Sequence, residues 1–204
     1  MGTETPSPAL HPDVAVLAPL LGTWVGEGVG TYPTIEGFSY REEISFGHVG
    51  KPFLAYRQAT RRLDTGLPAH AESGYLRGVG PTAAGTAPAA PTDVVPTAGG
   101  NVAEPTDVAG APEGGAAVGI AVELVLAHPT GLAELAAGEA VATADGLTVH
   151  VRSTEVARTA TAKEVLTTER RIVVVGDELR YEVAMGAVGQ PHQHHLEATL
   201  RRRP

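Results

Sequence analysis

The amino-acid sequence predicts an all-β fold: a ten-stranded antiparallel up-and-down barrel with a short N-terminal helix and a long disordered insert. Short segments of alternating or apolar residues recur about every dozen positions between turn residues, as in antiparallel sandwiches and barrels. Glycines are repeated within the first of these segments, which indicates a bent strand or close backbone approach. Closing such strands into a barrel removes exposed edges and encloses a cavity for one ligand.

The elements expected along the chain follow from local patterns. Residues 1–12 are rich in proline, serine and threonine and are expected to form a flexible tail, before a barrel domain at 13–204. The apolar segment 14–21 predicts a short helix, interrupted by Pro19, that would act as a lid or plug. Ten strands are expected at 22–32, 38–48, 53–63, 70–79, 120–127, 132–142, 147–154, 162–175, 178–188 and 194–202.

Residues 80–119 break the strand pattern. They contain no aromatic residue and are dominated by proline, alanine, glycine and threonine. Such a composition cannot bury enough apolar surface to offset the entropy of ordering it. Because the cost of closing a loop grows slowly with its length, we expect a disordered loop between two strands of one domain.

Composition excludes several classes of function. Cysteine is absent, which excludes disulfides, zinc thiolates, iron–sulfur clusters and cysteine nucleophiles. The formal net charge is -8 and no basic patch is present, so nucleic acid is not an expected partner. No apolar run reaches the roughly 18 residues of a membrane span, so no membrane association is expected. The first twelve residues lack the cationic start and apolar core of a signal peptide, so the expected location is cytoplasmic.

Common catalytic motifs are absent or out of context. The pattern G-x-W-x-G-x-G at 22–28 precedes a strand rather than a helix, so it is not a dinucleotide fingerprint. Neither a Walker A loop nor a G-x-S-x-G elbow occurs. The adjacent Glu42 and Glu43 would lie on opposite faces of a strand, and we expect solvent or rim charges rather than an acid/base dyad.

Three of the eight histidines, His192, His194 and His195, fall within four positions near the C-terminus. Neutral imidazole is a common ligand for transition metals and for haem iron, and one axial histidine can hold haem inside a pocket. A polar surface cluster is the alternative. A metal site made of His192 and His194 is disfavoured because no third ligand is in view. The isolated His48, His70, His128 and His150 are expected in turns, at the rim or lining the pocket.

Several blocks of the sequence together resemble the nitrobindin family. The blocks occur in order over roughly residues 14–80 and 120–202, and the insert departs from the compact family pattern. They include residues 20–28 around Trp24, the Tyr-Pro-Thr-Ile block at 32–35, the Thr-Ala-Lys-Glu block at 161–164 and the segment 187–196.

This resemblance implies a barrel similar to fatty-acid-binding and lipocalin-like barrels, with one haem b per subunit near its mouth. It also implies that the ferric haem isomerises peroxynitrite to nitrate and that nitric oxide binds reversibly. By the same resemblance His195 is the axial iron ligand, and Thr34 and Lys163 are haem-contacting positions. Lys163 would pair with a propionate, and Trp24 would be a packing anchor at the floor of the barrel.

Alternation and the family motif select different histidines. His194 has the parity of Leu196, Ala198 and Leu200, so simple alternation places His194 on the apolar face. A β-bulge can swap parity, and we follow the motif in choosing His195. The alternative function is a non-enzymatic carrier or sensor of haem and nitric oxide, or a carrier of a small hydrophobic ligand. The sequence does not indicate an oligomeric state.

Overall fold

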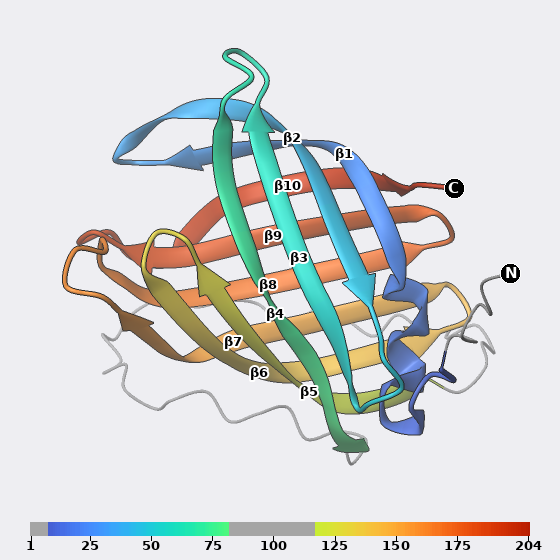
Figure 1. The fold of residues 1–204 in the computed structure, drawn as a ribbon. Coiled ribbons are helices and arrows are strands. Elements are labelled where there is room, and N and C mark those ends of the chain that lie inside the picture. Colours follow the sequence, from blue (N-terminus) through green and yellow to red (C-terminus); the bar gives the residue numbers. More distant parts are fainter. Residues whose placement is uncertain (1–7, 82–116) are drawn as a thin grey trace, which may run out of the picture.

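The computed structural model describes residues 8–81 and 117–204, and in this part of the chain ten antiparallel strands close into a barrel (Figure 1). The strand order around the barrel is β1-β10-β9-β8-β7-β6-β5-β4-β3-β2, so each strand pairs with its neighbours in sequence and the last strand closes on the first. The predicted fold class is therefore confirmed. Most of the predicted disordered insert and of the predicted tail lie outside the described residues.

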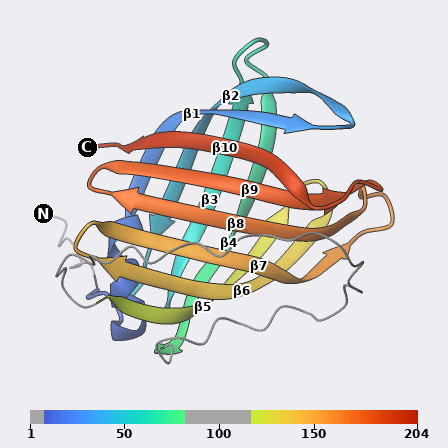
Figure 2. The ribbon, with the colours of Figure 1, turned by 180° about the vertical axis from the view of Figure 1, so that it is seen from behind.

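The barrel has two walls whose strands cross at a steep angle. Figures 1 and 2, which view the molecule from opposite sides, show β2–β4 in one wall and β7–β10 in the other. Within residues 8–81 and 117–204, no helix has the length and apolar character needed to span a membrane. The elements are the 3-10 helix η1 (Pro12–Leu20) and the strands β1 (Gly22–Tyr32), β2 (Ile35–Gly47), β3 (Phe53–Arg62), β4 (Pro68–Pro81), β5 (Val118–His128), β6 (Leu132–Thr143), β7 (Gly146–Arg158), β8 (Val165–Val175), β9 (Glu178–Ala187) and β10 (Gln193–Arg202).

Some strand boundaries differ from those expected from the sequence. β8 begins at Val165 rather than at residue 162, because the chain turns there: Thr159 N–H donates to the carbonyl of Gly131, and Ala162 N–H donates to the carbonyl of Thr159. β2 begins earlier than expected, since Tyr32 pairs with Ile35 and only two residues separate β1 from β2.

One end of the barrel is closed by η1, which packs against β3–β7. Its apolar side chains Val14 and Leu17 are fully buried. The buried Trp24 of β1 donates its indole N–H to the carbonyl of Leu20 at 2.8 Å, and the Arg202 guanidinium lies 4.1 Å from the Trp24 ring centroid. The predicted plug and packing anchor are thus confirmed.

Side chains at alternate positions of each strand fill the interior, as the pleat of a strand requires. Large apolar side chains gather toward the η1 end, where Leu54, Leu147 and Leu200 are buried. Polar side chains take over in the remaining interior, where Glu42, Gln58, Glu72, Glu134 and Arg170 are buried. The interior therefore combines an apolar floor with a polar upper part.

Candidate functional site

A cavity of about 420 Å³ lies at the barrel end opposite η1, where β2 and β4 begin and β5 ends. Its floor is the polar part of the interior. Part of its wall is polar and contains His70, Glu72 and His128, and the rest is largely apolar, built from Ile35, Phe38, Leu132, Val156, Val165, Val183, Met185 and Leu196. Such a site suits a ligand with a large apolar body and few polar contacts.

His195 faces this cavity because β10 contains a bulge. Opposite β9, His194 pairs with Ala184 and Leu196 pairs with Val183, so His195 is the extra residue. His195 and Leu196 both line the cavity, whereas the His194 side chain is 47% exposed and lies 3.7 Å from the Glu197 carboxylate. The prediction from simple alternation was therefore wrong at this point, and the bulge gives the physical reason.

A backbone contact fixes which ring nitrogen of His195 carries the proton. Nδ1 lies 2.9 Å from the carbonyl oxygen of Thr31 in β1, and a carbonyl only accepts hydrogen bonds. Nδ1 is therefore the donor, and Nε2 keeps its lone pair. Burial lowers the pKa of His195, against the opposing effect of the Thr31 carbonyl, so the neutral ring is favoured. A neutral imidazole whose second nitrogen is held by a backbone carbonyl is the form that ligates metals.

Tyr32, which follows Thr31 in β1, packs against the imidazole ring of His195. Its aromatic ring meets that of His195 edge to face. Its hydroxyl accepts the N–H of Ala187 at 2.9 Å and lies 3.2 Å from the Ala187 carbonyl, to which it donates. The end of β1 is thereby joined to the end of β9 across the bulged strand. Sequence reasoning gave Tyr32 no role, although the Tyr-Pro-Thr-Ile block contains it.

Of the other two residues predicted to contact a ligand, only one lines the cavity. Lys163, in the segment between β7 and β8, is exposed and belongs to the lining. Thr34 is exposed in the turn between β1 and β2, and its neighbour Ile35 lines the cavity instead. The structure therefore brings His195 and Lys163 together around one cavity and leaves Thr34 beside it.

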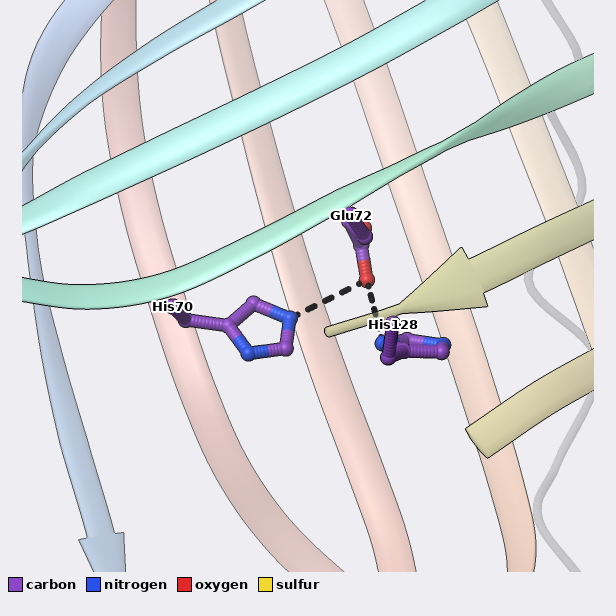
Figure 3. Close-up of side chains that lie close together, drawn as sticks. All are labelled: His70, Glu72 and His128. Atoms are coloured by element: carbon purple, nitrogen blue, oxygen red, sulfur yellow. Dashed lines mark hydrogen bonds and ion pairs between the residues drawn. The ribbon is translucent and has the colours of Figure 1, made fainter. Parts of the chain in front are cut away.

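A buried ion pair crosses the polar interior. The Arg170 guanidinium donates to both carboxylate oxygens of Glu72, at 2.6 and 3.2 Å, and the Tyr56 hydroxyl donates to the first of these oxygens at 2.6 Å. Burial opposes the ionisation of Glu72, but Arg170 and two nearby histidines hold its pKa well below its usual range. Those histidines are His70 and His128, which are isolated in the sequence but meet at Glu72 in the fold (Figure 3).

Glu42 belongs to a second polar group. The prediction that it is a solvent or rim charge was wrong, since Glu42 is only 1% exposed. It accepts hydrogen bonds from the Gln58 amide and from the Tyr181 hydroxyl. Burial raises its pKa to about 7. The signal was present in the sequence, because Glu42 shares the parity of the buried Tyr40 and Ile44.

Comparison with known proteins identifies close relatives. Residues 13–202 match the family model described as "THAP4-like, heme-binding beta-barrel domain". A protein named peroxynitrite isomerase from Nocardia farcinica is 46% identical, with 97% of this chain and 95% of that protein covered. Peroxynitrite isomerase 2 from Mycobacterium ulcerans is 45% identical, with 95% and 97% covered. The crystal structure of Rv2717c from M. tuberculosis superposes with a TM-score of 0.73 at 38% identity, covering 96% of this chain and 100% of that one.

Proposed function

Because the chain belongs to the THAP4-like, heme-binding beta-barrel domain family, we propose that it is a haem-dependent peroxynitrite isomerase with His195 as the axial iron ligand. The membership confirms the resemblance to nitrobindins carried by the sequence blocks. Relatives named peroxynitrite isomerase align with nearly the whole chain, which supports the activity. The observation that carries the ligand assignment is the Nδ1 contact of His195 with Thr31, which leaves Nε2 as the metal-binding nitrogen.

The residues around the cavity fit haem. The apolar wall suits the faces of a porphyrin, and Nε2 of His195 suits its iron. Lys163 at the cavity edge would pair with a propionate, as a cation does with a carboxylate. The chain has no cysteine that could form a thioether link, so the proposed cofactor is non-covalent haem b. Because His195 is the one iron ligand proposed in each chain, we propose one haem per subunit.

The proposed role of Thr34 is more peripheral than those of His195 and Lys163. It lies in the two-residue turn that connects β1, which carries the Thr31 carbonyl, to β2, which carries the cavity residue Ile35. Its hydroxyl is exposed at the same end of the barrel. We therefore propose a contact at the edge of the cofactor rather than within the cavity.

The proposed reaction rearranges one anion into another without net gain or loss of a proton or electron. Bound haem would supply a Lewis-acidic iron with a coordination position for peroxynitrite or nitric oxide. His195 would hold that iron through a neutral ring and so would add no charge of its own. The apolar wall excludes water, and Lys163 attracts anions toward the opening. Since the peroxynitrite and nitrate anions contain no hydrogen, the rearrangement transfers no proton and requires no side chain as general acid or base.

The neighbouring histidines provide matched tests of the ligand assignment. His195→Ala removes the proposed protein–iron bond, so haem should be lost or bound weakly and heterogeneously. Nitrate yield from peroxynitrite should then fall to that of haem free in solution. His194→Ala and His192→Ala should retain haem, since both side chains are substantially exposed. The measurements are the Soret position, the haem dissociation rate and the nitrate yield of all three variants.

Two results would contradict the proposal. Loss of haem from His194→Ala but not from His195→Ala would show that the ligand is the adjacent residue. Retention of haem by all three variants would place the ligand elsewhere. A wild-type protein that binds haem but gives no more nitrate than its haem-free form would be a carrier or sensor of nitric oxide, not an isomerase.

A further inference from the structure

Two histidines and a glutamate converge on one wall of the cavity (Figure 3). His70 and Glu72 come from β4, and His128 is the last residue of β5. Nε2 of His70 lies 3.3 Å from Oε2 of Glu72, and Nδ1 of His128 lies 3.4 Å from the same oxygen. We propose that these three residues bind a divalent first-row transition-metal ion, at a site separate from His195.

The distances from the two histidine nitrogens to Oε2 of Glu72 suit a metal ion better than they suit hydrogen bonds. The atoms all lie within 4.8 Å of one another. Ligands held at about 2.0–2.2 Å by a tetrahedral ion lie roughly 3.3–3.6 Å apart. The two nitrogen–oxygen distances to Glu72 fall at the start of that range, and both exceed the usual length of a hydrogen bond from nitrogen to oxygen.

The donor types select the class of metal. Two imidazole nitrogens and one carboxylate oxygen favour zinc, iron, cobalt or copper over magnesium and calcium, which prefer oxygen ligands. A set of two histidines and one carboxylate also leaves coordination positions for water or a small ligand. Because the three residues line the cavity, those positions would face its interior.

The surrounding residues orient the proposed ligands as they do in known metal sites. Nδ1 of His128 faces Glu72, while its Nε2 lies 3.6 Å from the Glu134 carboxylate. Thr168 in turn donates its hydroxyl to Glu134 at 2.7 Å. A carboxylate behind a ligating histidine fixes its tautomer and raises its basicity. On Glu72, Arg170 donates to Oε1 at 2.6 Å and more weakly to Oε2 at 3.2 Å, and Oε2 is the oxygen that both histidines approach.

The charges of the buried groups near these three residues also favour a bound cation. Two buried carboxylates, Glu72 and Glu134, lie near the Arg170 guanidinium, so among these three groups the negative charges outnumber the positive one. A buried unpaired charge is costly. A metal cation would compensate it. The competing explanation is that the contacts of His128 with the two carboxylates are hydrogen bonds alone, and it predicts no metal binding.

The proposed site is distinct from the haem ligand. His195 is on β10, and four steps around the barrel, through β1, β2 and β3, separate β10 from β4. The two groups therefore come from strands that are not neighbours in the barrel (Figures 1 and 2), although both groups line the same cavity. The inference does not depend on the proposed isomerase activity, and its failure would leave that activity untouched.

Cobalt(II) is a suitable probe because its visible d–d absorption reports coordination. The full-length chain in its haem-free state would be titrated with Co²⁺, followed by displacement with Zn²⁺. We expect one equivalent to bind. His70→Gln and His128→Gln keep a hydrogen-bonding side chain next to Glu72 but remove the nitrogen ligand. Loss of a residue that only orients a metal ligand costs about 10–100-fold in metal affinity. Loss of a ligand itself should cost at least as much, so each substitution should weaken Co²⁺ binding more than about tenfold.

A cluster of the same residue types on the outside of the barrel provides the control. His150 and His192 lie 2.6 and 3.3 Å from the carboxylate of Glu169, and both side chains are about 40% exposed. The double variant His150→Gln/His192→Gln should leave the one-to-one binding unchanged. If that variant loses Co²⁺ while the two interior variants keep it, the interior site is refuted.

A measurement on the wild-type protein covers the case in which an interior variant does not fold. Co²⁺ at the proposed site should shift or broaden the ring NMR signals of His70 and His128 and spare that of His150. The reverse pattern would overturn the proposal. The absence of any stoichiometric Co²⁺ binding would also overturn it.

Discussion

The ring of Tyr32 meets the ring of His195 edge to face, with centroids 5.3 Å apart and planes inclined at 75°. Tyr32 is itself immobilised by hydrogen bonds of its hydroxyl to β9. The imidazole of His195, the proposed iron ligand, is thus held at Nδ1 by the Thr31 carbonyl and on one side by the ring of Tyr32. Tyr32 acts as a positioning residue for His195.

Tyr32→Phe should loosen this arrangement without removing the aromatic contact. The substitution leaves the buried N–H of Ala187 without its acceptor, which should lower the free energy of unfolding by about 1–3 kcal/mol. Haem should dissociate faster, with the Soret position unchanged. Tyr75→Phe is the control, because Tyr75 is 50% exposed. Equal denaturant midpoints and haem dissociation rates for wild type and Tyr32→Phe would contradict the positioning role.

Glu42 should make the protein less stable as the pH rises from about 4.5 to about 7. Burial raises the pKa of Glu42 from 4.5 to about 7, so in this window the folded chain keeps a proton that the unfolded chain releases. The loss of unfolding free energy reaches at most about 3 kcal/mol at the upper end. Glu42→Gln, which resembles the protonated acid, should remove this decline.

The measurement for Glu42 is the difference in unfolding free energy between the variant and the wild type at several pH values. The difference should grow in favour of Glu42→Gln as the pH rises, whereas the histidines affect both proteins alike and cancel. Glu43→Gln is the control for removing a carboxylate from the same strand, since Glu43 is exposed and paired with Arg203. A difference that stays constant with pH would argue against a raised pKa at Glu42.

Gly26→Val should destabilise the barrel. A Cβ atom at Gly26 would meet the carbonyl oxygen of Thr199 well inside contact distance and would lie 2.7 Å from Cα of Leu200. Because both are backbone atoms of the paired strand β10, relief requires the strands to move apart, at roughly 1–3 kcal/mol. Gly47→Val is the matched control, since nothing lies within 4 Å of a Cβ atom there. Similar denaturant midpoints for the two variants would show that close strand approach is not the reason for Gly26.

Replacing residues 82–116 with a short turn should preserve folding and haem binding. Pro81 pairs with Ile120 at the ends of β4 and β5, so the two strands are already neighbours where the replaced segment begins and ends. The segment contains no aromatic residue and no leucine, isoleucine or methionine. Thermal melts and haem titrations of the shortened chain test this expectation. A variant with residues 82–116 in shuffled order is the control for length, and a large loss of stability in the shortened chain alone would show that the length itself is needed.

Alternation predicted most of the barrel, and it also contained more information about the interior than the motifs suggested. Glu42 lies in phase with Tyr40 and Ile44, and Arg170 lies in phase with Ile172, so the same period that identifies the strands places these charges inside. Glu42 was misjudged because residue type was given more weight than parity, and Arg170 was not considered. Buried charges in a barrel are unusual only when they lack partners.

Two parts of the site were beyond the reach of alternation. The bulge at His195 changes parity at one residue, and only the family motif indicated the result. The meeting of His70 with His128 depends on the register between β4 and β5, in which Ser73 pairs with Ala127. Tight turns set register in hairpins, but β4 and β5 are separated by residues 82–117, and no sequence pattern across them fixes which residues meet.

The helix η1 closes one end of the described barrel, so ligands enter and leave the cavity at the other end. The order in which two ligands bind should therefore matter. A ligand that reaches the polar wall around Glu72 has to pass the rim where His195 and Lys163 stand, and it has to leave by the same route. A flat cofactor bound at that rim would block access to the inner part of the cavity. We therefore expect metal exchange at the inner wall to be rapid before haem is added and slow afterwards, so that the sequence of loading decides which contents the protein retains.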